Sequence, residues 1–169
     1  ETLFPIWIKR AMNTVLQDNS LDFLRESFSM HIYCAAHAGE YLKKLSSKQV
    51  EEFWAVALNP SKEIIRAKMI FRGTVDSCQV HPREVFRFAC IYQASSLIVA
   101  HNHPSDDLKP SSLDLIVTRN LVKAGGILQI PLVDHLIVTK SGFTSLADSG
   151  WIDFPEHYNS LSLNERSHG

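Results

Sequence analysis

The stretch SLIVAHNHP, residues 96–104, decides the fold, because a short apolar run leads directly into two histidines. An apolar run of this length, without alternation, is typical of a strand that is covered on both faces. His101 and His103 are two residues apart, so on extended backbone their imidazoles project to the same side. We therefore expect the chemistry of this protein to begin where a buried strand ends.

Upstream of this strand the sequence predicts a β-hairpin and a helix. Residues 51–58 (EEFWAVAL) and 64–71 are β-like, and an Asn-Pro-Ser turn at 59–61 separates them. Pro82 can occupy the first turn of a helix that ends near Ala94. The order hairpin, helix, strand favours a sheet with helices packed on it.

Downstream, residues 104–110 are a loop by composition, and apolar residues recur at helical spacing from Ser111 until Gly125 and Gly126 stop the helix. Further strands are predicted within 127–138 and 143–146. The fold class is therefore α/β, of the mixed α+β kind, with a mixed sheet flanked by helices.

Three parts of the chain are expected. Residues 1–45 are a helical N-terminal lead-in, with helical periodicity that continues from Leu21 to Leu45. Residues 46–154 form the main domain, and residues 155–169 are a polar tail.

Composition indicates an ordinary globular domain, with 169 residues of which 45% are hydrophobic and 21% charged. A chain of this length can build its core without a structural metal or disulfides, so a metal is available for chemistry. The net charge of -1 and the pI of about 6.8 lack the basic character of a nucleic-acid-binding protein, although nucleic-acid binding stays an alternative.

Cysteine usage and hydropathy favour a cytoplasmic protein. The three cysteines are odd in number and far apart, which indicates reduced core residues. No apolar run approaches the ~20 residues that a membrane-spanning helix needs, and the first residues do not resemble a signal peptide. We therefore expect no membrane association.

The residues that carry chemistry follow the pattern HxHP, six residues, then SxxD. Two strand histidines can bind one ion, and a loop that leads into a helix can return Asp114 as a third ligand. Three protein ligands leave a tetrahedral site with an open position, as a catalytic zinc requires. A carboxylate is then needed as general base, and Ser111 is a candidate to stabilise an oxyanion.

Each of these residues also has a structural interpretation. Ser111 and Asp114 resemble the N-terminus of a helix, in which the serine caps and the aspartate lies in the first turn. Asp134 and His135 are interpreted either as support for the fold or as residues that orient a metal ligand. His81 precedes a helix and is interpreted as a local hydrogen-bonding residue.

Longer motifs resemble the JAMM metalloproteases, also called MPN+ or JAB1-like, and within that group the RadC family. The resemblance runs from about residue 45 to 152. Its motifs are FRGT at 71–74, VHPREVF at 80–86, HNHPS at 101–105, PSSLD at 110–114, DHLIV at 134–138 and FTSLADSGW at 143–151.

The resemblance implies a zinc metallopeptidase that cleaves peptide or isopeptide bonds. It implies His101, His103 and Asp114 as ligands of Zn²⁺, and Ser111 as the hydroxyl that assists the oxyanion. It implies a glutamate on the first hairpin strand as general base. Glu51 fits the motif because Phe53 lies two residues later, while Glu52, on the opposite strand face, is the alternative.

The same resemblance implies the three-layer α/β fold of JAMM domains, which is similar to the cytidine deaminase fold. A deaminase is disfavoured, because the chain lacks the HxE and PCxxC motifs that hold zinc in those enzymes. The sequence departs from the family at Asp106, where RadC-like chains usually have glycine. It also has no helix-hairpin-helix signature in its first 45 residues.

Two alternatives involve no catalysis. One is an accessory protein of DNA repair or mobile elements that binds DNA or protein partners, and the other is a degenerate domain that acts as a scaffold. The presence of all three ligand residues, the serine and a glutamate favours catalysis over both. Substrate identity and oligomeric state stay open.

Overall fold

The apolar run that precedes His101 forms the middle strand of a five-stranded sheet. In the computed structural model, which describes residues 30–73 and 80–154, this strand is β3 (Ser96–Asn102) and all of its residues are buried. It lies between β1 (Glu52–Leu58) and β4 (Leu132–Val138), whose residues are buried as well. The strand covered on both faces, which the apolar run predicts, is therefore confirmed.

The sheet is mixed, with strand order β2-β1-β3-β4-β5. The hairpin partner β2 (Ile64–Arg72) and strand β3 both run antiparallel to β1. Strand β4 runs parallel to β3, because the long helix α4 (Ser112–Leu128) carries the chain back between them. The short strand β5 (Phe143–Ser145) pairs antiparallel with β4 at the edge.

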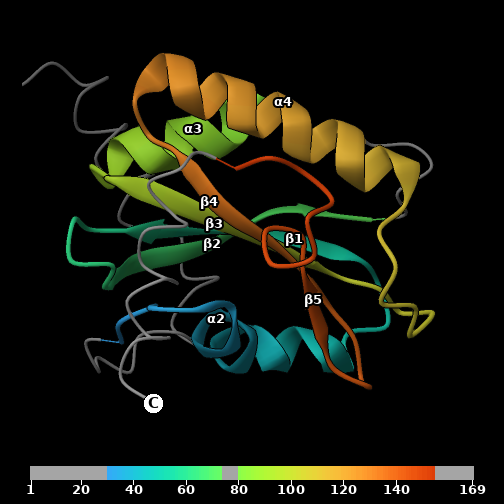
Figure 1. Ribbon diagram of the computed structural model, residues 1–169. Helices are drawn as coiled ribbons and strands as arrows, with labels where there is room; N and C mark the ends of the chain where they lie inside the picture. Colours follow the sequence, from blue (N-terminus) through green and yellow to red (C-terminus); the bar gives the residue numbers. More distant parts are fainter. Residues whose placement is uncertain (1–29, 74–79, 155–169) are drawn as a thin grey trace, which may run out of the picture.

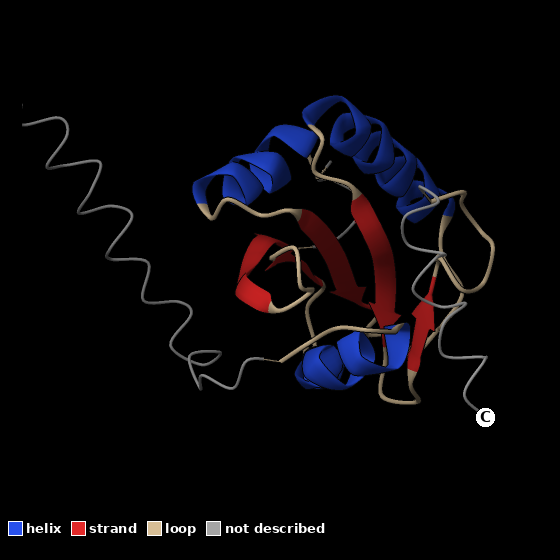
Figure 2. Ribbon diagram, turned by 60° about the vertical axis from the view of Figure 1, so that its left-hand side comes forward, coloured by secondary structure: helices blue, strands red, loops and turns tan. Residues whose placement is uncertain are grey.

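Helices cover both faces of the sheet, which makes three layers (Figure 1). Helix α2 (Ala35–Leu42) and the 3₁₀ helix η2 (Lys43–Ser47) lie on one face, while α3 (Pro82–Ile91) and α4 lie on the other, as Figure 2 also shows. Trp54 packs in the core on the α2 side and Phe53 in the core on the α3 and α4 side. The predicted mixed α/β class with helices on both faces is confirmed.

The N-terminal part of the described chain is less helical than its periodicity predicts. Residues 30–34 are not helical; instead Ile32 N–H donates to Lys62 C=O and Ile64 N–H donates to Met30 C=O. Pairing with the hairpin thus replaces helix in this segment, and the predicted continuous helix is wrong there. Residues 1–29, 74–79 and 155–169 lie outside the description, so most of the lead-in, the polar tail and the domain limits stay predictions.

Helix α4 does not stop at its two glycines. It continues to Leu128, and Gln129 ends it in the left-handed conformation with φ of 57°. Residues 127–131 are therefore not a strand. The glycine pair was misinterpreted because Gly125 serves close packing: a Cβ there would lie 2.6 Å from the Ile130 carbonyl oxygen.

None of the helices in the described ranges is both long and apolar enough to cross a lipid bilayer.

The two glycines give a matched test of this packing. We expect Gly125→Ala to destabilise the protein by about 1–3 kcal/mol, because the added methyl group must displace backbone of the chain that enters β4. We expect Gly126→Ala to stabilise it by about 0.5–1 kcal/mol, since an added Cβ meets no atom within 4 Å and alanine favours helix. Urea unfolding measures the free energy of unfolding of both variants. Equal changes in the two would contradict the claim that Gly125, but not Gly126, is needed for close packing.

Candidate metal centre

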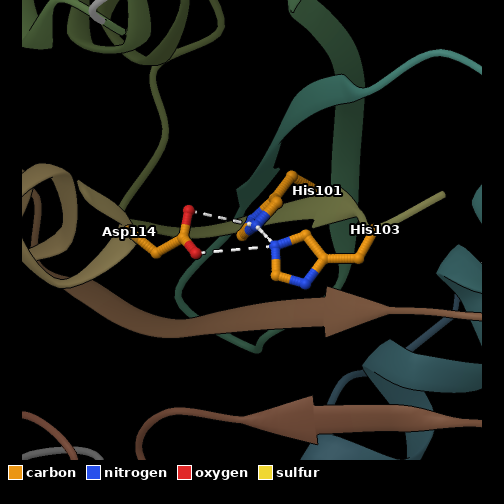
Figure 3. Close-up of side chains that lie close together, drawn as sticks. All are labelled: His101, His103 and Asp114. Atoms are coloured by element: carbon orange, nitrogen blue, oxygen red, sulfur yellow. Dashed lines mark hydrogen bonds and ion pairs between the residues drawn. The ribbon is translucent and has the colours of Figure 1, made fainter. Parts of the chain in front are cut away.

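Three side chains from consecutive elements converge at the end of β3. His101 is the penultimate residue of that strand, His103 follows in the loop, and Asp114 lies in the first turn of α4. Figure 3 shows the two imidazoles and the carboxylate pointing toward one another. His101 Nε2 lies 2.9 Å from His103 Nε2 and 3.2 Å from Asp114 Oδ1, and His103 Nε2 lies 3.5 Å from Asp114 Oδ2.

This arrangement can hold a metal ion. Each of the three residues offers one ligand atom, and these atoms all lie within 4.8 Å of one another. Two imidazoles and one carboxylate are a donor set that zinc accepts, and three protein ligands leave a position open. His81, at the start of α3, is outside this group; its backbone carbonyl accepts from Glu84 N–H, but its side chain makes no cap hydrogen bond to the helix.

His103 is held in a defined orientation by the backbone. The backbone N–H of His103 donates to Val138 C=O and so extends the pairing of β3 with β4 by one residue. Its Nδ1 lies 2.7 Å from the Asp107 carbonyl oxygen, which can only accept a hydrogen bond, so Nδ1 carries the proton. The Nε2 atom, which faces Asp114, is then free to act as a ligand.

The loop after His103 is closed by Asp106, the residue that departs from the family pattern. Asp106 N–H donates to His103 C=O, and Asp106 has φ of 64°, a left-handed conformation that glycine adopts readily and aspartate tolerates. Its carboxylate accepts hydrogen bonds from the Ser141 N–H and hydroxyl, which lower the pKa of Asp106. The aspartate thus keeps the turn and adds a connection to the segment between β4 and β5.

Asp114 has a second task as part of the cap of α4. Its Oδ2 accepts from the N–H and the hydroxyl of Ser111, both at 2.7 Å, while its own N–H donates to Ser111 Oγ at 3.1 Å. This is a complete capping box, so the structural interpretation of both residues is confirmed. The hydroxyl hydrogen of Ser111 points at Asp114, and its role toward an oxyanion stays a prediction.

The electrostatics of the group favour an ionised aspartate. Burial raises the pKa of Asp114, but hydrogen bonds from His101 and His103 outweigh burial and hold this pKa well below its usual range. The hydrogen bond to Asp114 also raises the pKa of His103, and the charge of Glu51 adds to this effect. The carboxylate therefore carries the charge that a cation requires.

Glu51 directly precedes β1, and Glu52 is the first residue of that strand. Phe53 stacks against His101, and alternation along extended backbone predicts that Glu51, two residues earlier, projects to the same side as Phe53. Glu52 is 3% exposed and bonded on the other side, where it accepts from Trp54 Nε1 and pairs with Arg72 at 3.5 Å. The strand alternation thus favours Glu51 as the carboxylate on the side of the histidines.

Asn102, between the two histidines, is a residue whose role sequence reasoning missed. Its side chain is buried, and it accepts from Glu52 N–H and donates to the carbonyl oxygens of Val50 and Lys48. These bonds hold the backbone on both sides of Glu51. The alternation of HNH could have indicated it, because the middle residue of the three faces away from the histidines.

The side chains of Asp134 and His135 have different partners. Asp134 fits the interpretation as support for the fold, and His135 fits the interpretation as a residue that orients a candidate metal ligand. The Asp134 carboxylate accepts from Ser145 Oγ, Ala147 N–H and His135 N–H, and so supports the turn after β5. His135 Nε2 lies 2.8 Å from His101 Nδ1. Burial lowers the pKa of His135 far below its usual value, so this imidazole is neutral.

A three-layer α/β domain with two histidines and an aspartate at the end of its middle strand has the architecture of JAB-type domains. Residues 32–151 match the family model of the RadC-like JAB domain. Since this match covers more than half of the chain, the protein belongs to that family, and the resemblance predicted from the motifs is confirmed.

Similar proteins of known sequence agree with this assignment. A UPF0758 protein of Staphylococcus carnosus is 38% identical over 116 residues, which make up 69% of this chain and 51% of that protein. A UPF0758 protein of Staphylococcus aureus is 43% identical over 103 residues, or 61% of this chain and 45% of that protein. This chain thus spans about half the length of these relatives, whose names state no activity.

The buried Asp134 makes stability depend on pH. Burial raises its pKa to about 6, against about 3.9 for an unfolded chain, so its stabilising contribution is full below about pH 4 and is lost as pH rises through about 6. An asparagine at this position does not titrate. We expect the stability of Asp134→Asn relative to the wild type to increase by about 2–3 kcal/mol between pH 4 and pH 8.

Urea unfolding at several pH values measures this difference, in which the titration of all other groups cancels. A difference that does not change with pH would show that the hydrogen bonds to Asp134 compensate its burial completely.

Proposed function

We propose that this chain is a zinc-dependent metallohydrolase of the JAMM type that cleaves amide bonds in a peptide or isopeptide. The observation that carries this proposal is the convergence of His101, His103 and Asp114 at the end of a buried strand, with their ligand atoms within 4.8 Å of one another. Membership of the RadC-like JAB family supports it.

The residues present fit zinc in donor type and in orientation. Both histidines direct Nε2 toward the aspartate, and a backbone carbonyl holds the proton of His103 on the opposite nitrogen. A zinc ion in such a site acts as a Lewis acid and lowers the pKa of a bound water to about 7.

Glu51 supplies the proton transfer that amide hydrolysis needs. Strand alternation from Phe53 predicts that Glu51 projects to the side of the histidines, and its charge contributes to the raised pKa of His103. A carboxylate at this position takes a proton from the attacking water and passes it to the leaving amine, which is a poor leaving group until it is protonated. Asn102 keeps the backbone around Glu51 in place.

Ser111 completes the proposed machinery. Its hydroxyl lies beside Asp114, at the N-terminus of α4, where the helix dipole favours negative charge. When the hydroxyl turns from Asp114 to the substrate, it donates to the oxygen on which negative charge develops.

The metal itself is the first point to test. We expect about one zinc per chain in the purified protein and none in a His101→Ala, His103→Ala double variant, because a lone carboxylate cannot hold the ion. Elemental analysis after dialysis measures this. Equal metal content in the two proteins would reject the hydrolase and favour the alternative of a domain that binds DNA or protein partners.

The two neighbouring glutamates give a matched pair for the general base. We expect Glu51→Gln to keep its zinc and to lower kcat by about 10²–10⁴-fold, because proton transfer is removed. We expect Glu52→Gln to keep most of its activity and to lose stability instead, since Glu52 pairs with Arg72 and Trp54. Quenched fluorescent peptides and isopeptides serve as substrates, and the reverse pattern would assign the base to Glu52.

A further inference from the structure

We propose that His135 and Thr118 are positioning residues, which hold the metal ligand His101 in the tautomer that offers Nε2 to the ion. This inference rests on the zinc site proposed above. It extends that site by two residues, one on β4 and one in the interior of α4.

His135 is completely buried, so both of its ring nitrogens need partners within the protein. It has two: Nε2 lies 2.8 Å from His101 Nδ1, and Nδ1 lies 2.6 Å from Thr118 Oγ1. Thr118 Oγ1 in turn lies 2.6 Å from the Asp114 backbone carbonyl oxygen. The four groups form a chain from His101 to the backbone of Asp114.

The end of this chain determines the direction of every hydrogen bond in it. A carbonyl oxygen only accepts, so the single hydroxyl hydrogen of Thr118 is donated to Asp114 C=O. This bond is the common one from a helical threonine to the carbonyl four residues earlier. Thr118 Oγ1 must therefore accept from His135, which places the proton of His135 on Nδ1.

His135 is completely buried, and the two groups that its ring nitrogens meet are an imidazole and a hydroxyl, neither of which carries a negative charge, so this position accommodates an uncharged ring. With its proton on Nδ1, its Nε2 has a lone pair and accepts from His101 Nδ1–H. In the zinc-loaded protein His101 would then offer a lone pair on Nε2, the atom that faces Asp114 and His103. The ring of Phe53 stacks on His101 and meets His135 edge-on, so water has little access to this chain.

This series of hydrogen bonds also connects two of the proposed ligands, His101 and Asp114. It begins at the His101 ring and ends at the carbonyl of Asp114, whose carboxylate reaches the same His101 from the other side. His103, by contrast, is oriented by a loop carbonyl at an exposed position. Both histidines meet Asp114 of α4, but only His101 is also connected to that helix through His135 and Thr118.

The first test is a direct measurement of the tautomer in the zinc-loaded full chain. Long-range ¹H–¹⁵N correlation spectra of histidine-labelled protein distinguish protonated Nδ1 from protonated Nε2. We expect His135 to carry its proton on Nδ1 and His101 to carry its proton on Nδ1 with a zinc-bound Nε2. A proton on Nε2 of His135 would overturn the proposal.

The second test is zinc affinity, measured by competition with a chromophoric chelator. We expect Thr118→Val, which has the same shape without the hydroxyl, to weaken zinc binding about 10–100-fold, and Thr118→Ser to stay within about threefold of the wild type. We expect the same contrast between His135→Leu and His135→Gln, because glutamine retains an acceptor for His101. The cobalt(II) absorption spectrum should change with the valine variant and not with serine.

These outcomes separate this inference from the proposed function. If the wild type binds zinc through His101 and His103 but Thr118→Val binds it equally well, with an unchanged cobalt spectrum, only the positioning role fails. If the wild type binds no zinc, both proposals fail. Circular dichroism and urea unfolding show whether each variant is folded at the assay temperature, and if the valine or leucine variant is not, the tautomer spectra of the zinc-loaded wild type decide the proposal.

Discussion

The burial of an imidazole at the end of the middle strand is the constraint on which the rest of this structure depends. His101 has no exposed surface, and a polar group removed from water is costly unless it is hydrogen-bonded. Its partners come from three places: Asp114 on α4, His103 in the following loop and His135 on β4. The crossover from β3 through α4 to β4 brings all three to one point, so the same topology that builds the core also builds the site.

The parts of the fold that depend on local pattern could be predicted from the sequence, and the parts that depend on packing could not. The apolar strand before His101 and the hairpin around its Asn-Pro-Ser turn have unambiguous signals. The pattern at Gly125 predicts a helix end, but glycine also permits close approach of two backbones, and only the neighbouring chain at Ile130 shows that close approach applies here. Residues 30–34 pair with the hairpin, a long-range contact that helical periodicity does not report.

The candidate site shows the same division. The spacing of His101, His103 and Asp114 was sufficient to predict that they converge, because a strand end and a helix start constrain where side chains point. The motif predicts the group of three residues that could hold a metal but not the residues around it. Thr118 was missed although it lies one helical turn after Asp114, since a lone threonine in a helix has many possible roles. Asn102 was quoted as part of the motif, yet its bonds on either side of Glu51 depend on a segment fifty residues away.

The double use of Asp114 has an evolutionary consequence. If the proposed catalysis is correct, a relative that lost it would still be under selection to keep Ser111 and Asp114, because their mutual hydrogen bonds start α4 whether or not a metal is present. His103 is partly exposed whereas His101 is completely buried, so packing constrains His103 less than His101. Among diverged relatives, loss of His103 is therefore expected to be the earliest mark of a domain that has become a pseudoenzyme.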